Sequence, residues 1–220
     1  MASRHQRRSI LTMTSAVLAA SAARAQGGLS VSIDFEATPV GQLPAGVTTA
    51  LTGSGGPVKW SVIEDPTAPA GSKVLAQTSA DRTDLRFPLA IFESAVGDAA
   101  VAVKFRAVAG EVDRAGGIAL RLSDAGNYYV VRANALEDNV RLYRVVGGQR
   151  IQFAGANAKV ASGTWHELGF EVRGNRFEVI FNGKSLFTAT DATFARPGRV
   201  ALWTKADSVT HFDELTIRSL

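Results

Sequence analysis

The sequence predicts an all-β protein, an antiparallel two-sheet β-sandwich, preceded by a cleavable signal peptide. Three observations support this fold class. After residue 30, apolar and polar residues alternate with a period of two, turn residues separate the alternating runs, and no helix-period stretch exceeds two turns. The chain has 220 residues, 46% of them apolar, so it is long enough to bury a core.

The first 25 residues have the pattern of a signal peptide. Arg7 and Arg8 end a basic segment, residues 10–23 are apolar, and Ala23-Arg24-Ala25 forms an A-x-A cleavage pattern. The arginine pair also suits a twin-arginine signal, and an ordinary secretory signal stays open beside it. No later apolar run approaches the roughly 18 residues of a membrane span. We therefore expect an exported protein, periplasmic or secreted, with no transmembrane segment in the mature chain.

Charge and cysteine content exclude several functions. The chain has no cysteine, which excludes a disulfide scaffold, a thiolate metal site and a cysteine nucleophile. Its formal net charge is +4, but removal of Arg4, Arg7, Arg8 and Arg24 with the signal lowers Lys plus Arg from 24 to 20, equal to the 20 Asp plus Glu. We therefore expect no nucleic-acid partner.

Residues 26–30 are expected to form a short linker and residues 31–220 one domain, because no composition break divides the latter. Clear strand alternation runs through residues 118–122, 128–135, 139–143 and 176–181. Turns are predicted at 124–127, 147–148, 174–175 and 182–183, of which Asn182-Gly183 is the strongest hairpin signal. Residues 191–196 suit one short helical turn. About a dozen strands favour a sandwich over a small filled barrel.

Residues 31–220 resemble the concanavalin A-like lectin/glucanase domains. The resemblance is carried by Trp165-His166-Glu167-Leu168, by the hairpin at 182–184, and by residues 198–202 and 212–213. The phrases at 127–143 and 202–215 look most like the laminin-G-like bacterial group that includes the 3-keto-disaccharide hydrolases. The resemblance implies a jelly roll with one concave sheet that in relatives often meets glycans. Its motifs are structural, so it implies no catalytic residues.

The outward-facing side chains of the predicted strands form a candidate sugar-binding surface. Aromatic rings stack on the apolar faces of pyranose rings, while Arg and Asn bind hydroxyl and carboxylate groups. A solvated sheet face with arginines paired to neighbouring carboxylates stays open as the alternative, as does burial of Trp203. We expect Trp60 and Trp165 in the core. The ligand-binding candidates are Arg121, Tyr128, Arg132, Asn134, Arg141, Trp203 and Lys205, and Asn139 and Tyr143 share their side.

Catalytic candidates are few. A laminarinase-type site needs two carboxylates in an Glu-x-Asp-x-x-Glu strand, but Gly116 stands at the third position after Asp113. A 3-keto sugar could instead be cleaved by elimination with one general base, since the keto group acidifies the neighbouring C–H. The candidates for that base are Asp207, His211 and Asp81.

No catalytic metal or cofactor is expected, but the sequence offers a candidate site for a structural calcium ion. Asp34 and Asp213 lie on the first and last predicted strands, which often neighbour each other in this kind of fold. Paired or N–H-capped aspartates are the alternative. Three functions follow as hypotheses: an exported glycan-binding module with a preference for acidic or oxidised sugars, a periplasmic enzyme of the 3-keto-disaccharide hydrolase type, and a cell-envelope module that binds a protein.

Overall fold

The computed structural model describes Met1 and residues 28–220, so the predicted signal peptide, apart from Met1, lies outside the described residues. Within them the chain forms fifteen strands in two antiparallel sheets. This confirms the predicted fold class. No helix in the described part is long and apolar enough to cross a membrane.

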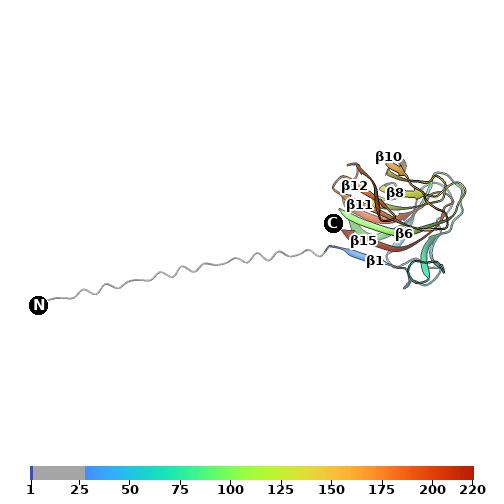
Figure 1. The fold of residues 1–220 in the computed structure, drawn as a ribbon, viewed down its shortest axis with the longest axis horizontal. Coiled ribbons are helices and arrows are strands. Elements are labelled where there is room, and N and C mark those ends of the chain that lie inside the picture. Colours follow the sequence, from blue (N-terminus) through green and yellow to red (C-terminus); the bar gives the residue numbers. More distant parts are fainter. Residues whose placement is uncertain (2–27) are drawn as a thin grey trace.

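The eight-stranded sheet has the order β13-β12-β11-β6-β15-β4-β3, with β1 paired to β15 beside that path. Figure 1 shows β12, β11, β6 and β15 side by side in it. The pairing of the first strand with the last confirms the predicted neighbourhood of the two ends. The strands of the eight-stranded sheet are β1 (Ser30–Ile33), β3 (Trp60–Glu64), β4 (Lys73–Gln77), β6 (Ala99–Ala109), β11 (Trp165–Arg173), β12 (Arg176–Phe181), β13 (Lys184–Thr190) and β15 (Val209–Ser219).

The seven-stranded sheet has the order β10-β9-β8-β7-β14-β5-β2. Its strand β14 comes late in the chain but lies between β7 and β5, so residues close to 200 meet residues close to 90 and 120. The strands are β2 (Val47–Gly53), β5 (Arg86–Val96), β7 (Ala115–Asp124), β8 (Asn127–Asn134), β9 (Asn139–Val146), β10 (Gln149–Asn157) and β14 (Gly198–Trp203).

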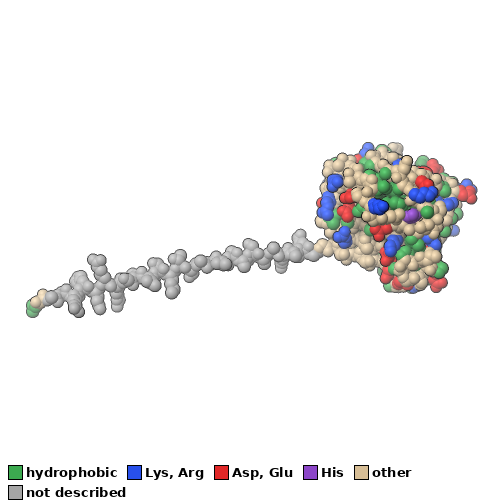
Figure 2. Space-filling view, in the orientation of Figure 1, with side chains coloured by type: hydrophobic (Ala, Val, Ile, Leu, Met, Phe, Trp, Pro, Cys, Tyr) green, Lys and Arg blue, Asp and Glu red, His purple; other side chains and the backbone are tan. Residues whose placement is uncertain are grey.

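The main core fills the space between the sheets. Alternate residues of each strand point into it, as the period of two predicts. In β8, for example, Tyr129, Val131 and Ala133 belong to this core, and in β12 Phe177 and Val179 do. The other half of the residues forms the two outer faces, and these two faces differ in character. The outer face of the eight-stranded sheet carries interspersed acidic and basic side chains (Figure 2). The outer face of the seven-stranded sheet carries a second cluster of buried apolar residues.

The predicted turns form where expected, with one correction. Asn182 and Gly183 both have positive φ, 50° and 75°, as a two-residue hairpin requires. Residues 191–196, however, form no helical turn. Side-chain bonds replace the helical ones there: Asp191 accepts the Thr193 N–H, and the hydroxyl of Tyr129 accepts the Phe194 N–H. The prediction of a helical turn was therefore wrong, because Asp competes with helix formation through local bonds of this kind.

Candidate functional site

The predicted binding residues of β8 and β9 do lie on one face, the outer face of the seven-stranded sheet. Asn134 pairs with Asn139, and Arg132 pairs with Arg141, so each pair shares a side of the sheet. Tyr128 lies two positions along β8 from Val130, which pairs with Tyr143. The period of two therefore places these side chains correctly.

The exposure of this face differs from the prediction. Trp203 and Tyr128 are fully buried, and Arg132 and Asn134 are only 4% and 1% exposed. Trp203 stacks on Phe87 at 5.4 Å between ring centroids and donates its indole N–H to the Tyr128 hydroxyl at 3.3 Å. The expectation of an open aromatic and arginine surface was therefore wrong for these four residues. The alternative of burial for Trp203 is confirmed, although in the second apolar cluster rather than in the main core.

Arg150 lies over the rings of Phe87, Tyr143 and Trp203. It comes from β10, where pairing with Val145 puts it on the same side as Tyr143. Its guanidinium carbon lies 4.5 Å from the ring centroid of Tyr143, 4.9 Å from that of Phe87 and 5.6 Å from that of Trp203. Such a cation over aromatic faces is favourable. The Nη1 atom of Arg150 is buried and has no hydrogen-bond partner among the described residues.

Arg132 is held beside Arg150 by a polar network that engages both of its Nη atoms. Its Nη1 donates to Asn139 Oδ1 at 2.7 Å, and its Nη2 donates to Glu137 at 2.8 Å and to the Tyr143 hydroxyl at 3.1 Å. Although burial opposes it, contact with Tyr143 and Glu137 raises the pKa of Arg132. The pairing of this arginine with a neighbouring carboxylate is the alternative that the sequence left open.

Lys205 closes the other side of the site. Its ammonium lies 2.7 Å from Asp84 and 3.1 Å from the buried Asp113. Although burial acts to lower it, pairing with Asp84 and Asp113 raises the pKa of Lys205. Burial raises the pKa of Asp113, whose other oxygen accepts the Asn134 amide at 2.9 Å. We call Arg150, Phe87, Tyr143, Trp203, Arg132 and Lys205 the Arg150 cluster.

The Arg150 cluster borders a cavity. Its volume is about 370 Å³, and its lining includes Arg150, Phe87 and the exposed side chains of Leu85 and Ile151. Small-molecule sites typically start at roughly 300 Å³, so the cavity has room for a single sugar unit. Burial lowers the pKa of Arg150, but a guanidinium keeps its charge in any protein environment.

Two of the predicted arginines do not join this cluster. Arg121 lies at an irregularity of β7 with φ of 52° and donates to the Phe194 carbonyl and to Asp98, at 2.8 and 3.3 Å. The predicted open position of Arg121 was wrong, because it is 5% exposed and a bulge in β7 interrupts the alternation. Arg141 shares the face but donates to Asn157 at 2.8 Å, where the contact is solvent-exposed.

The three candidate bases are not brought together. The carboxylate of Asp207 accepts the backbone N–H groups of Glu111, Val112 and Asp113 at 2.7 to 3.2 Å. Although burial opposes it, these N–H groups lower the pKa of Asp207. Bonds from Thr83 and Gly56 lower the pKa of Asp81 to about 2.

His211 belongs to the other sheet. It lies in β15 and its Nδ1 is 2.7 Å from Asp65 Oδ2. Burial lowers the pKa of His211, which the bond to Asp65 opposes. The carboxylates of Asp207 and Asp81 thus accept hydrogen bonds from the protein itself, and the three candidate groups form no common centre.

Asp34 and Asp213, the candidate calcium ligands, accept hydrogen bonds from backbone N–H groups. Asp213 is fully buried and accepts the N–H groups of Ala70 and Glu214 at 2.9 and 2.8 Å. Asp34 is exposed and accepts the Glu36 N–H. The described residues contain no group of three or more His, Cys, Asp or Glu placed to hold a metal ion. This arrangement matches the alternative of N–H-capped aspartates.

Arg150 and Phe87 were missed at the level of sequence. A signal for Arg150 was present, since the turn at 147–148 folds the next strand back on 139–146 and alternation then puts Arg150 beside Tyr143. Phe87 carried no such signal, because β5 meets Trp203 only through the insertion of β14.

Comparison with known proteins places the chain in a family. Residues 94–220 match the family model described as galactocerebrosidase, C-terminal lectin domain. No curated protein matches the chain. Among solved structures, the carbohydrate-binding module CBM66 of Bacillus subtilis is similar with a TM-score of 0.64 and 19% identity, over 82% of this chain and 100% of the module.

Two glucanases share the fold as well. The β-glucanase of Bacillus licheniformis has a TM-score of 0.60 and 13% identity over 89% of this chain and 100% of its own. A β-1,3-1,4-glucanase from a mouse hindgut metagenome has a TM-score of 0.53 and 9% identity over 86% and 98%. At these identities the structures show the concanavalin A-like fold and nothing about activity. The chain belongs to the family of galactocerebrosidase C-terminal lectin domains.

Proposed function

We propose that this protein is an exported carbohydrate-binding module and that the Arg150 cluster is its binding site. One observation carries the proposal: Arg150 lies over three aromatic rings at the edge of a cavity and keeps a buried nitrogen without a partner in the described structure. A buried donor without an acceptor is costly, so an acceptor brought by a ligand would be strongly favoured. The lectin-domain family and the likeness to a carbohydrate-binding module support sugar as the ligand.

The charges of the cluster favour an acidic sugar. Arg132 is paired with Glu137, and Lys205 is paired with Asp84 and Asp113. Arg150 has no ion-pair partner among the described residues. A carboxylate on the ligand could therefore bind its guanidinium with two parallel hydrogen bonds.

The test is a titration with oligogalacturonates and with neutral galacto-oligosaccharides, followed by tryptophan fluorescence because Trp203 lies directly below Arg150. We expect saturable binding and a preference for the acidic series. Arg150→Met should weaken binding of the acidic series by about ten- to one-hundredfold, the loss of one charged hydrogen-bonding group.

Arg173→Ala is the matched control, because Arg173 is an exposed arginine in β11 of the opposite sheet. This variant should bind as the wild type does. An Arg150→Met protein that folds and binds both series normally would exclude the Arg150 cluster as the site. Equal affinity of the wild-type protein for the two series would contradict the acidic preference, and binding of neither series would contradict the proposed site.

Cleavage of 3-keto-glycosides is a further hypothesis that rests on the sequence resemblance alone. Elimination needs a base that faces the substrate, and a carboxylate with a lowered pKa such as that of Asp207 is a weak one. Incubation with a 3-keto-glucoside should therefore yield no product above the uncatalysed rate. Binding of a protein in the cell envelope would use the same surface, and competition by oligogalacturonate separates that hypothesis from sugar binding.

A further inference from the structure

Trp165 is placed differently from the other two tryptophans. Trp60 and Trp203 are buried, whereas Trp165, at the start of β11, is only partly buried on the outer face of the eight-stranded sheet. The expectation that Trp165 is a core residue was therefore wrong. Its ring lies on a sheet face that otherwise carries charged and small side chains.

A buried charge network holds the indole in one orientation. Its Nε1–H donates to the Thr67 hydroxyl at 3.2 Å, and that hydroxyl donates to Asp65 at 2.8 Å. The guanidinium of Arg106 lies 5.6 Å from the ring centroid of Trp165 and bonds Asp65 at 2.7 Å. Asp65 is 2% exposed and also bonds His211. One carboxylate thus fixes both groups that hold the ring, which is the preorganisation that a binding platform needs.

The rest of the indole faces a pocket of about 400 Å³. Lys104 and Glu167 contribute polar groups to the lining of this pocket, and Pro69 an apolar one. Lys104 is already paired with Glu214. An aromatic ring with hydrogen-bonding groups beside it is the arrangement by which proteins bind the C–H face and the hydroxyls of a pyranose.

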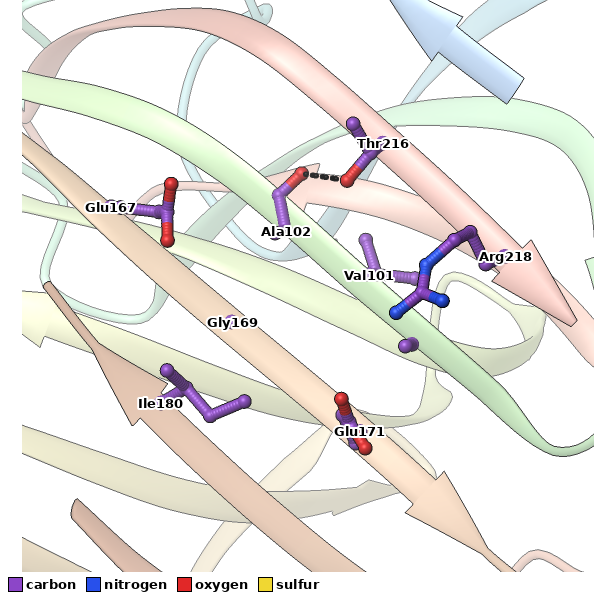
Figure 3. A pocket seen from close by; sticks show the side chains of 9 residues that line it. Val101, Ala102, Glu167, Gly169, Glu171, Ile180, Thr216 and Arg218 are labelled. Carbon is purple, nitrogen blue, oxygen red and sulfur yellow. Dashed lines mark hydrogen bonds between the residues drawn. The ribbon is translucent and has the colours of Figure 1, made fainter. Parts of the chain in front are cut away.

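A second hollow continues from this pocket along the same strands. Glu167 lines both, and the second, of about 180 Å³, is lined by Gly169, Ala100, Ala102 and Ile180. Figure 3 shows Glu167 and Glu171 on either side of Gly169 along β11, with Thr216 and Arg218 of β15 across from them. We call this second hollow the trough. It exists because small residues form its floor, where a Cβ added at Gly169 would already lie 3.0 Å from Ile180.

We infer that these two hollows form a second carbohydrate-binding groove, the Trp165 groove, which takes a neutral pyranose chain. One ring stacks on Trp165, and the following units lie over Gly169 and Ala102 within reach of Glu167, Glu171 and Arg218. The carboxylates of Glu167 and Glu171 repel an acidic sugar but accept bonds from hydroxyls. The groove lies on the opposite sheet from the Arg150 cluster and does not depend on it.

The three tryptophans provide the test. In a ¹⁵N-labelled protein each gives one indole N–H signal, and Trp165→Phe identifies the signal of Trp165. Cellohexaose, mannohexaose, xylohexaose and laminarihexaose are the probes. We expect at least one to shift the Trp165 signal saturably while the Trp203 signal stays in place. No saturable shift of the Trp165 signal with any of the four would overturn the inference.

Two variants test the trough. Ala102→Leu fills its floor from an outward-facing position of β6, and should weaken hexasaccharide binding about tenfold while leaving binding of the matching methyl glycoside unchanged. Val108→Leu, at an exposed position of the same strand, is the control and should change neither. Equal hexasaccharide affinity in Ala102→Leu and the wild type would exclude the trough. Arg150→Met should leave the Trp165 titration unchanged, so failure of either site is distinguished from failure of the other.

Discussion

At the scale of single residues, several groups that look chemically active are structural. Arg86 is the clearest example, because its fully buried guanidinium donates to the carbonyls of Gly56, Pro57 and Ala206 at 2.8 to 3.2 Å. Asp207 is the acidic counterpart, with three backbone N–H groups on one carboxylate. Arg86 thereby holds residues 56–57 and 206, and Asp207 holds residues 111–113. The charged groups of Arg86 and Asp207 thus bind backbone atoms of the protein.

Asp207→Asn is expected to lower the free energy of unfolding by about 1–3 kcal/mol, because an amide replaces one of the two accepting oxygens by a donor. The depressed pKa of Asp207 adds a pH dependence. The stabilisation by Asp207 is fully present above the pKa of an aspartate in the unfolded chain, about 3.9. It is lost as the pH falls through the lower pKa of Asp207 in the folded protein. Urea denaturation at pH 7 and pH 3 measures both effects.

Glu64→Gln is the control for this variant, since Glu64 is an exposed residue of β3. It should unfold with the wild-type midpoint. An Asp207→Asn protein as stable as the wild type at pH 7 would show that the three N–H bonds contribute no net stability. Asp207 would then have to be tested again as a general base.

At the scale of elements, the β12–β13 hairpin shows how one turn serves two purposes. Asn182 and Gly183 supply the two positive φ angles of the turn. The Asn182 side chain also accepts the Glu167 N–H at 3.0 Å and contacts His166 at 3.1 Å, which ties the hairpin to β11. The hairpin therefore helps to position the strand that carries Trp165.

Gly183→Ala should destabilise the protein by about 1–2 kcal/mol, the cost of a Cβ in a left-handed conformation. No atom lies within 4 Å of the added Cβ, so steric crowding contributes nothing. Gly97→Ala is the matched control, because Gly97 does not have a positive φ and an added Cβ meets only an ordinary contact. Thermal unfolding followed by circular dichroism compares the two, and equal midpoints would contradict the argument from φ.

At the scale of the whole molecule, the two outer faces have opposite character. The seven-stranded sheet buries aromatic and charged groups under Arg150, while the eight-stranded sheet keeps a charged face with one partly exposed tryptophan. With a proposed groove on each sheet, one copy could bind two glycan chains. The stability of the whole domain is also linked to pH through His211, which packs against Asp65 and Arg106.

Burial lowers the pKa of His211 in the folded protein. As the pH falls below about 6.5, the unfolded chain therefore takes up a proton before the folded one, and stability falls. In His211→Asn this contribution should vanish, so the difference in unfolding free energy between wild type and variant should shrink between pH 8 and pH 5. A difference independent of pH would contradict the lowered pKa.

The sequence by itself determined the strands, the hairpins and the side of the sheet on which Arg132, Asn134, Tyr128 and Trp203 lie. These properties are local, because alternation with a period of two and a turn that needs positive φ depend only on neighbouring residues. For the same reason the alternation failed at Arg121, where a bulge interrupts the register.

Only the tertiary structure decided which faces are covered. Trp203 is buried because β14 inserts between β7 and β5 and because Arg150 of β10 lies above it. Asp207 and His211, four residues apart, lie against different partners because the first is capped by residues 111–113 and the second pairs with Asp65 across the other sheet. Trp165 is held in one orientation because Asp65, a hundred residues earlier, binds both Thr67 and Arg106, which contact the indole. Such contacts join segments far apart in the chain, and no local pattern encodes them.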